Sequence, residues 1–261
     1  MCTVSESSQS DPQDATSNID RRRFVRLCAS ALALAGINPQ LLAQQSDATL
    51  RRYQRVRLVD ADGKTLRATD LRAGENYVFH YPYVSTPCFL LNLGEAAPGG
   101  AQLSTSDGHA YTWQGGVGPQ RSVVAFSAIC AHRMTYPAHS VSFINYRPKI
   151  VTFLDKHDAP EERSHVIYCC SEKSVYDATQ GARVLGGPAP QPLAAIVLEY
   201  DDKDGGLFAS GTYGGALFQR FFDKFGFHLS LEYLNKDIRQ EVSQTAAVVP
   251  LSQYSATQVL C

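Results

Sequence analysis

The chain has 261 residues, enough for one large domain or two small ones. Apolar residues make up 44 % of it, charged residues 19 %, and the net charge is −1. This balance excludes a dedicated nucleic-acid binder, which needs clustered positive charge, and a disordered acidic chain. Frequent Gly (19) and Pro (13) favour short strands and tight turns.

The N-terminal region has the pattern of an export signal. Residues 1–19 are polar, and we predict no regular structure for them. Three consecutive arginines, 21–23, precede Phe24 and a short apolar run over 27–37. The paired arginines resemble a twin-arginine signal. The run is too short to span a bilayer comfortably, so cleavage near Ala43 and retention as an anchor both stay open.

The rest of the chain is rich in short apolar runs bounded by turn residues. We divide it into a disordered N-terminus with the signal (1–45), a main domain (46–230) and an extension (231–261). Many short strands predict an antiparallel sandwich or barrel. One helical pattern, 216–225, has an aromatic stripe that we assign to core packing. The predicted strands are 53–59, 77–81, 87–93, 121–128, 150–153, 165–168, 194–200 and 206–211.

The cysteines suggest a metal centre more than a disulfide framework. There are seven, and five remain outside the N-terminal region, an odd number. Cys130-Ala131-His132 follows a buried strand, and Cys169-Cys170-Ser171-Glu172 follows the strand 165–168. Two such junctions can bring soft ligands to one metal centre. A rigid loop containing Pro188 lies further on, at 186–193.

These elements resemble a Rieske iron–sulfur protein over residues 115–211. The resemblance implies an all-β, Rieske-like sandwich or barrel and a [2Fe–2S] cluster with two thiolate and two imidazole ligands. It also implies that Ser174 and Tyr176 hydrogen-bond to the cluster and that the loop with Pro188 covers it. Residues 141–164 are an inserted segment between the cluster loops, and the C-terminal extension is helical.

The second cluster loop departs from the family pattern Cys-x-x-His. One register makes Cys169 the ligand and places Glu172 where histidine is expected. The other register makes Cys170 the ligand and places Lys173 there. Many members also bridge the two loops by a disulfide, and Thr135 and Ser171 occupy those positions here. The chain therefore resembles the members that lack the bridge.

The candidate metal ligands are Cys130, His132, Cys169, Cys170 and Glu172. The fourth ligand stays open between Glu172, the second of the adjacent cysteines, and a histidine such as His139 or His165. A carboxylate or thiolate in place of a neutral imidazole adds negative charge, which disfavours the added electron. We therefore expect a lower reduction potential within the range of such centres.

The sequence lacks a glycine-rich phosphate loop, a nucleophile elbow and a zinc-protease motif. We therefore expect an electron-transfer component of an oxidoreductase rather than a stand-alone catalyst. The expected protein is an exported, periplasmic [2Fe–2S] carrier, either free or anchored to the inner membrane. Its partner is a cytochrome or an oxidoreductase subunit. The alternative is a cluster-free structural or binding subunit that keeps the Rieske fold.

Overall fold

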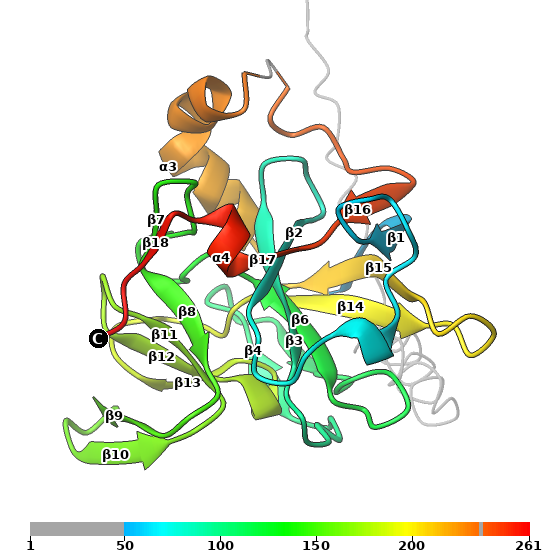
Figure 1. Cartoon of the computed structure of the whole chain (residues 1–261). Coiled ribbons are helices and arrows are strands. Elements are labelled where there is room, and N and C mark those ends of the chain that lie inside the picture. Colours follow the sequence, from blue (N-terminus) through cyan, green and yellow to red (C-terminus); the bar gives the residue numbers. More distant parts are fainter. Residues whose placement is uncertain (1–49, 235–236) are drawn as a thin grey trace, which may run out of the picture. The chain divides into compact units, whose positions relative to one another are not determined.

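The computed structural model describes residues 50–234 and 237–261. The predicted signal at the N-terminus lies outside the described residues. The described chain is built mainly of strands, which confirms the all-β prediction. Figure 1 shows how these strands are arranged. Within the described residues, no helix is both long and apolar enough to cross a membrane.

One eight-stranded sheet forms the base of the domain. Its strands, in the order of their pairing, are β16 (Thr245–Ala247), β1 (Leu50–Val59), β15 (Leu207–Tyr213), β14 (Ala195–Tyr200), β6 (Val123–Ser127), β3 (Pro87–Asn92), β2 (Tyr77–His80) and β17 (Val249–Pro250). β16 and β17 stand at opposite ends of this order, yet they are almost continuous in sequence. Residues 245–250 therefore join the two edges and bring the sheet close to a closed barrel.

A smaller sheet carries the second cysteine motif. Its strands, in the order of their pairing, are β13 (Arg183–Gly186), β12 (Ser174–Asp177), β11 (Val166–Cys169) and β8 (Ile144–Arg147). The predicted insertion thus adds β8 to this sheet. It also forms a hairpin of β9 (Val151–Leu154) and β10 (Pro160–Arg163).

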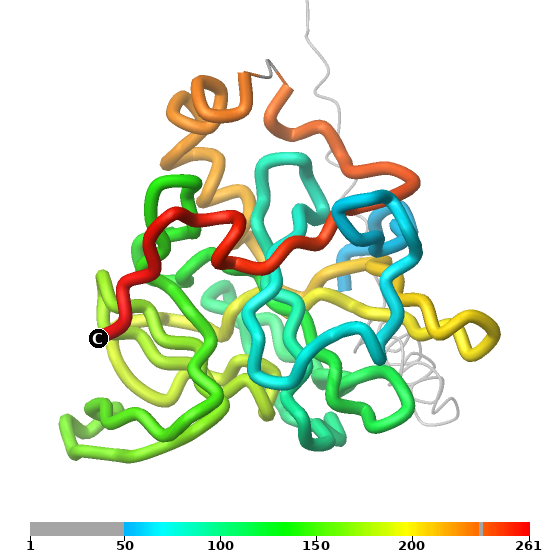
Figure 2. Tube along the Cα trace, in the orientation of Figure 1, coloured from blue at the N-terminus to red at the C-terminus, as the bar shows by residue number. Residues whose placement is uncertain are grey.

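Short pairs complete the strands. β4 (Gln102–Ser104) pairs with β5 (Ala110–Thr112). β7 (Val141–Ser142) pairs in parallel with β18 (Thr257–Gln258). The part of the extension that the structure describes is mostly extended, with one short helix, α4 (Leu251–Tyr254). As Figure 2 shows, this segment runs back toward β7 and β8, where the chain ends.

The main helix is α3 (Leu217–Glu232), and the 3-10 turns are η1 (Ala68–Asp70) and η2 (Ala178–Gln180). The aromatic stripe of α3 is buried, as expected for core packing. Its buried residues are Leu217, Phe218, Phe221, Phe222 and Leu229. Burying them stabilises the helix on the sheet, because most helical stability comes from packing of the apolar face.

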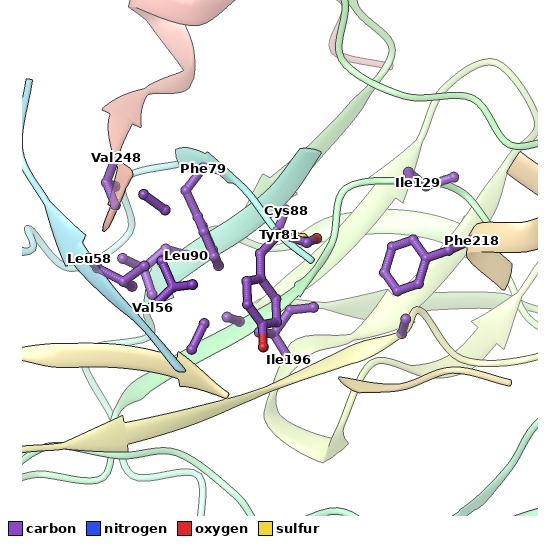
Figure 3. Close-up of a cluster of buried hydrophobic side chains, with 14 of the residues drawn as sticks. Val56, Leu58, Phe79, Tyr81, Cys88, Leu90, Ile129, Ile196, Phe218 and Val248 are labelled. Carbon is purple, nitrogen blue, oxygen red and sulfur yellow. The ribbon is translucent and has the colours of Figure 1, made fainter. Parts of the chain in front are cut away.

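The continuously apolar strands are explained by two cores, one on each face of the large sheet. Cys88 and Leu90 of β3 face the first core, and Phe89 and Leu91 face the second. The alternation follows from the two-residue period of a strand. Figure 3 shows the first core around Leu58, Leu90 and Phe218. The second core extends to Cys130 and Cys169, so it supports both cysteine motifs.

Candidate metal centre

The first cysteine loop begins three residues after β6. The backbone N–H of Cys130 donates to the carbonyl oxygen of Thr135 at 2.8 Å, and the N–H of Met134 donates back to Cys130 at 2.9 Å. Met134 adopts a positive φ of 62° to close this turn. These bonds fix a compact loop over 130–135, which presents Cys130 at the end of a fully buried strand.

The second cysteine loop is the turn between β11 and β12. Cys169 and Ser174 are paired across these two strands. The N–H of Lys173 donates to the carbonyl oxygen of Cys169 at 2.7 Å, and Lys173 has a positive φ of 58°. Cys169 therefore lies at the last position of β11, directly before this turn.

The two loops bring Cys130 and Cys169 together. Both thiols are buried and interact with each other. The hydrogen bond that they share lowers the pKa of Cys130 and raises the pKa of Cys169, because one proton serves both sulfurs. The Cys130 sulfur is thus the one of the pair that loses its proton more easily, and the deprotonated sulfur is the form that binds metals.

Hydrogen-bond donors surround the thiol pair. The hydroxyl of Tyr176 lies 3.2 Å from the Cys130 sulfur, and it accepts a hydrogen bond from the N–H of Ala131 at 3.0 Å. Backbone N–H groups of Ser171 and Glu172 are directed at the Cys169 sulfur. Such donors stabilise negative charge on sulfur, which is the charge that a metal-bound thiolate carries.

His132 and Glu172 meet beside the thiol pair. Nδ1 of His132 lies 3.3 Å from Oε2 of Glu172, and the two side chains are 28 % and 18 % exposed. Arg133 also approaches this carboxylate, with 3.7 Å between its Nε and Oε2. Glu172, which stands at the position of the expected histidine in one of the two registers, therefore lies beside His132 of the first loop.

The donor set fits a group held by two thiolates on one side and by an imidazole and a carboxylate on the other. Nδ1 of His132 is buried without a well-formed hydrogen bond, which is costly unless something binds there, and the hydroxyl of Ser174 interacts with the Cys130 sulfur. Within the described residues, no group of three or more such side chains is arranged around a single metal ion.

Cys170 differs from the expectation. It forms a disulfide with Cys261, so its sulfur is not free to bind a metal in this structure. The odd cysteine count had argued against a disulfide. The count misled because one bond can coexist with free thiols, which in the described chain are Cys88, Cys130 and Cys169.

The two histidines considered as a fourth ligand lie elsewhere. His139 contacts the carbonyl oxygen of Tyr254 through Nδ1 at 3.2 Å. His165 precedes β11 at the end opposite to Cys169, and its Nδ1 lies 2.6 Å from the hydroxyl of Tyr146. Both imidazoles therefore have polar partners other than the two thiols.

The proline-rich loop is packed against the second cysteine loop. Gly187 has a positive φ of 75°, and a Cβ there would collide with the carbonyl of Lys173. Pro188 itself is exposed. Only glycine permits this approach, so the close contact comes from Gly187, one residue before the proline that the resemblance singles out.

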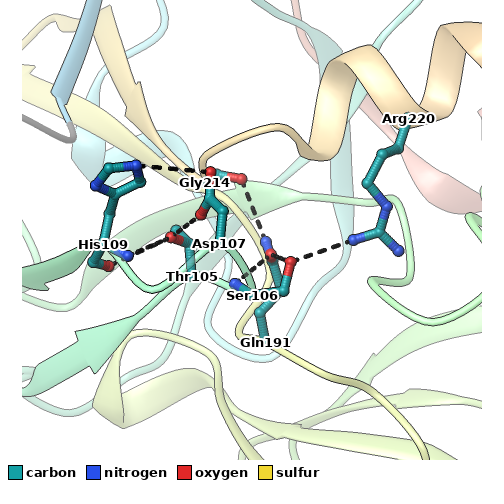
Figure 4. A network of polar contacts seen from close by, with 7 residues as sticks. All are labelled: Thr105, Ser106, Asp107, His109, Gln191, Gly214 and Arg220. Carbon is teal, nitrogen blue, oxygen red and sulfur yellow. Dashed lines mark hydrogen bonds and ion pairs between the residues drawn. The ribbon is translucent and has the colours of Figure 1, made fainter.

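A buried glutamine holds the other end of the proline-rich loop, as Figure 4 shows. Oε1 of Gln191 accepts hydrogen bonds from the backbone and hydroxyl of Ser106 at 2.9 and 2.7 Å, and its Nε2 donates to Gly214. Arg220 of α3 links Ser106 to the first cysteine loop through the carbonyl oxygen of Ala131 at 3.3 Å. Hydrogen bonds through Ser106 and Arg220 thus connect the proline-rich loop to the first cysteine loop.

Sequence reasoning missed three of these residues. The sequence does not indicate that Cys261 pairs with Cys170, because the two cysteines are 91 residues apart. Gln191 and Arg220 are polar residues without a motif, and only their burial or their contacts reveal a role. The adjacent pair Cys169-Cys170 was the available clue, since one site rarely uses both sulfurs.

Sequence comparison relates the chain to subunits of a reductase. It is 29 % identical over 196 residues to the iodate reductase subunit IdrB of Denitromonas iodatirespirans, covering 75 % of this chain and 82 % of that one. It is 27 % identical over 199 residues to the IdrB of a Pseudomonas species, covering 75 % and 80 %. No family model matches the chain.

Among solved structures, the soluble domain of Rieske protein II from Sulfolobus acidocaldarius is similar. The identity is 23 % and the TM-score 0.41, over 63 % of this chain and 82 % of that one. The chain is thus an all-β protein whose sequence is similar, over three quarters of its length, to the IdrB subunits of iodate reductase.

Proposed function

We propose that this protein is an exported Rieske-type electron-transfer subunit of a respiratory or periplasmic oxidoreductase. The observation that carries the proposal is the buried pair of thiols from two separate loops. The Tyr176 hydroxyl is hydrogen-bonded to one sulfur, and His132 and Glu172 lie beside the pair. Such a site suits a [2Fe–2S] cluster, which supplies one-electron chemistry when bound.

In this proposal Cys130 and Cys169 are the thiolate ligands, and His132 and Glu172 hold the other side. Tyr176 and the backbone N–H groups stabilise charge on the sulfurs. His132 is partly exposed, so solvent reaches part of its ring. Glu172 adds negative charge where a neutral imidazole is expected, and this favours a lower reduction potential.

The similarity to IdrB supports the partner class. Those relatives are subunits of iodate reductase, and the chain covers most of their length. We therefore propose that this chain delivers or accepts electrons for another oxidoreductase subunit or a cytochrome, without a catalytic site of its own. The oxyanion or other substrate belongs to that partner.

Export is supported by two independent features. The arginine pair before the apolar run 27–37 has the pattern of a twin-arginine signal. The Cys170–Cys261 bond is of a kind that persists in oxidising compartments such as the periplasm. We propose a periplasmic location, with the N-terminal segment either removed or kept as an inner-membrane anchor.

The test is purification of the full chain from the periplasm under anaerobic conditions. We expect equal amounts of iron and acid-labile sulfide, with the visible absorption and paramagnetic resonance of a [2Fe–2S] centre. Cys130→Ser and Cys169→Ser should each abolish these signals. Cys88→Ser is the matched control, because the Cys88 thiol donates to Tyr81 in the core and should leave them unchanged. Full iron content in Cys130→Ser would overturn the assignment.

Glu172 can be tested separately. Glu172→His supplies the missing imidazole and removes one negative charge, so the reduction potential should rise, whereas Glu172→Asp should keep it low. An identical potential in all three proteins would show that Glu172 does not contact the cluster.

A cluster-free structural subunit is the second candidate. It is favoured by the contacts of Glu172, since His132 and Arg133 both approach this carboxylate and could neutralise it without a metal. Periplasmic protein that is folded, bound to its partner subunit and free of iron and sulfide would establish this alternative.

A further inference from the structure

The segment 251–261 contacts the chain that follows the first cysteine loop and then reaches the second cysteine loop. It first contacts the residues that follow the first loop: the hydroxyl of Ser255 donates to the carbonyl oxygen of Ala138 at 2.7 Å, and the N–H of Ala256 donates to His139 at 2.8 Å. It then runs as β18 beside β7, with a parallel pairing. The segment therefore begins its course on the Cys130 side of the site.

The same segment ends on the second loop. The N–H of Val259 donates to Ser142 at 2.9 Å, and its carbonyl oxygen accepts from the side chain of Asn145 at 2.9 Å. The last contact is the covalent bond between Cys261 and Cys170. Because Cys170 is adjacent to Cys169, this bond acts directly on the position of the thiol that faces Cys130.

Without the bond, the adjacent cysteines would present two similar sulfurs at the same turn. The pairing of β11 with β12 and β8 favours Cys169 on the inner face, and the next side chain along a strand points to the other face. Cys170 lies just beyond the last strand residue, and only one backbone hydrogen bond, from its N–H to Phe143 at 2.7 Å, restrains it. A turn is easier to rearrange than a paired strand.

We propose that residues 251–261 form a strap between the second cysteine loop and the chain just after the first one, and that the Cys170–Cys261 bond selects Cys169 as the sulfur facing Cys130. Cys261 is thus a positioning residue for the metal centre. This inference deepens the proposed function. Its test uses sulfur pairing in cluster-free protein, so it can fail while cluster binding stands.

The experiment uses the full chain, stripped of iron with a chelator and treated briefly with diamide. Diamide accepts two electrons and two protons from a pair of thiols and is reduced to the hydrazine as the disulfide forms. Peptide mass spectrometry then identifies which cysteines are joined. The wild-type protein should give Cys130–Cys169 besides the existing Cys170–Cys261 bond. Cys261→Ser should give additional products in which Cys170 is joined to Cys130 or Cys169.

Two variants keep the test decisive. The double variant Cys170→Ser with Cys261→Ser also lacks the strap bond but leaves neither of these sulfurs to compete, so it should give Cys130–Cys169 alone. Amide exchange at 170–173 should become about tenfold faster in both variants, since opening a disulfide frees local motion. Cys88→Ser, in the distant core, should match the wild type. If Cys261→Ser gives only Cys130–Cys169 with unchanged exchange, the proposal is wrong.

Discussion

The large sheet and the small sheet differ in what their residues bury. The large sheet separates two apolar cores, and its continuous runs such as Val123–Ser127 are buried on both faces. The region of the small sheet and the cysteine loops contains the buried atoms His132 Nδ1 and Asn145 Oδ1, which lack a hydrogen bond. Unsatisfied groups are costly, so this region gives up some of the stability that the apolar cores of the large sheet supply.

The largest effect should come from the large sheet. Leu90→Ala removes a fully buried side chain at the centre of the first core. We expect the free energy of unfolding to fall by about 3–5 kcal/mol, because the site cannot collapse completely. Chemical denaturation measures this. In the fraction that stays folded, diamide should still join Cys130 to Cys169; loss of that product would mean that the two regions are not separate.

A pH-dependent effect should appear at the junction of β2, α3 and α4. His80 contacts the hydroxyls of Tyr233 and Tyr254 at 3.0 and 3.2 Å. Burial, and secondarily the nearby His139, lowers the pKa of His80 to about 4. The unfolded chain therefore binds the proton more readily, and stability falls as the pH drops from about 6.5 toward 4, by at most about 3 kcal/mol. His80→Gln should flatten this part of the stability profile; an unchanged slope would contradict the assignment.

Gly187→Ala should damage the small-sheet region selectively. The added Cβ collides with the backbone of Lys173, and the alanine would have to adopt a positive φ. We expect a loss of up to about 3 kcal/mol and displacement of the second loop. Gly63→Ala is a control, since that glycine also has a positive φ but open space around it. Lower iron content in Gly187→Ala but not in Gly63→Ala would show that metal binding depends on the packing at Gly187. Equal iron content in both variants would contradict this prediction.

The smallest effect should follow from Tyr176→Phe. The substitution keeps the buried ring but removes the hydroxyl that contacts the Cys130 sulfur and accepts from Ala131. We expect about 1–2 kcal/mol of destabilisation, from the donor left unpaired. If a cluster is bound, its potential should become more negative, because a donor to sulfur stabilises the reduced state. Voltammetry measures the potential, and a rise would contradict this role.

The sequence predicts the two regions unequally. The apolar runs at 87–93 and 121–128 identify strands of the large sheet, because burial on both faces leaves an unmistakable pattern. β12 (Ser174–Asp177) and β13 (Arg183–Gly186) were not predicted, since they are short and carry polar residues. The site was anticipated as far as Cys130, His132 and two registers for the second loop. The choice between the registers depends on strand pairing and on Cys261, which are contacts between distant parts of the chain.

The closure of the large sheet by residues 245–250 has a consequence for how the protein is made. β1 and β2 are synthesised early, yet each lacks one neighbour until β16 and β17 follow. The barrel therefore cannot be completed while the ribosome is still adding these residues. Until then two strand edges stay open to other chains, which is a hazard during synthesis. Such distant pairing also slows folding. A chaperone that shields the nascent chain until it is released would thus act at the step where this fold is most exposed.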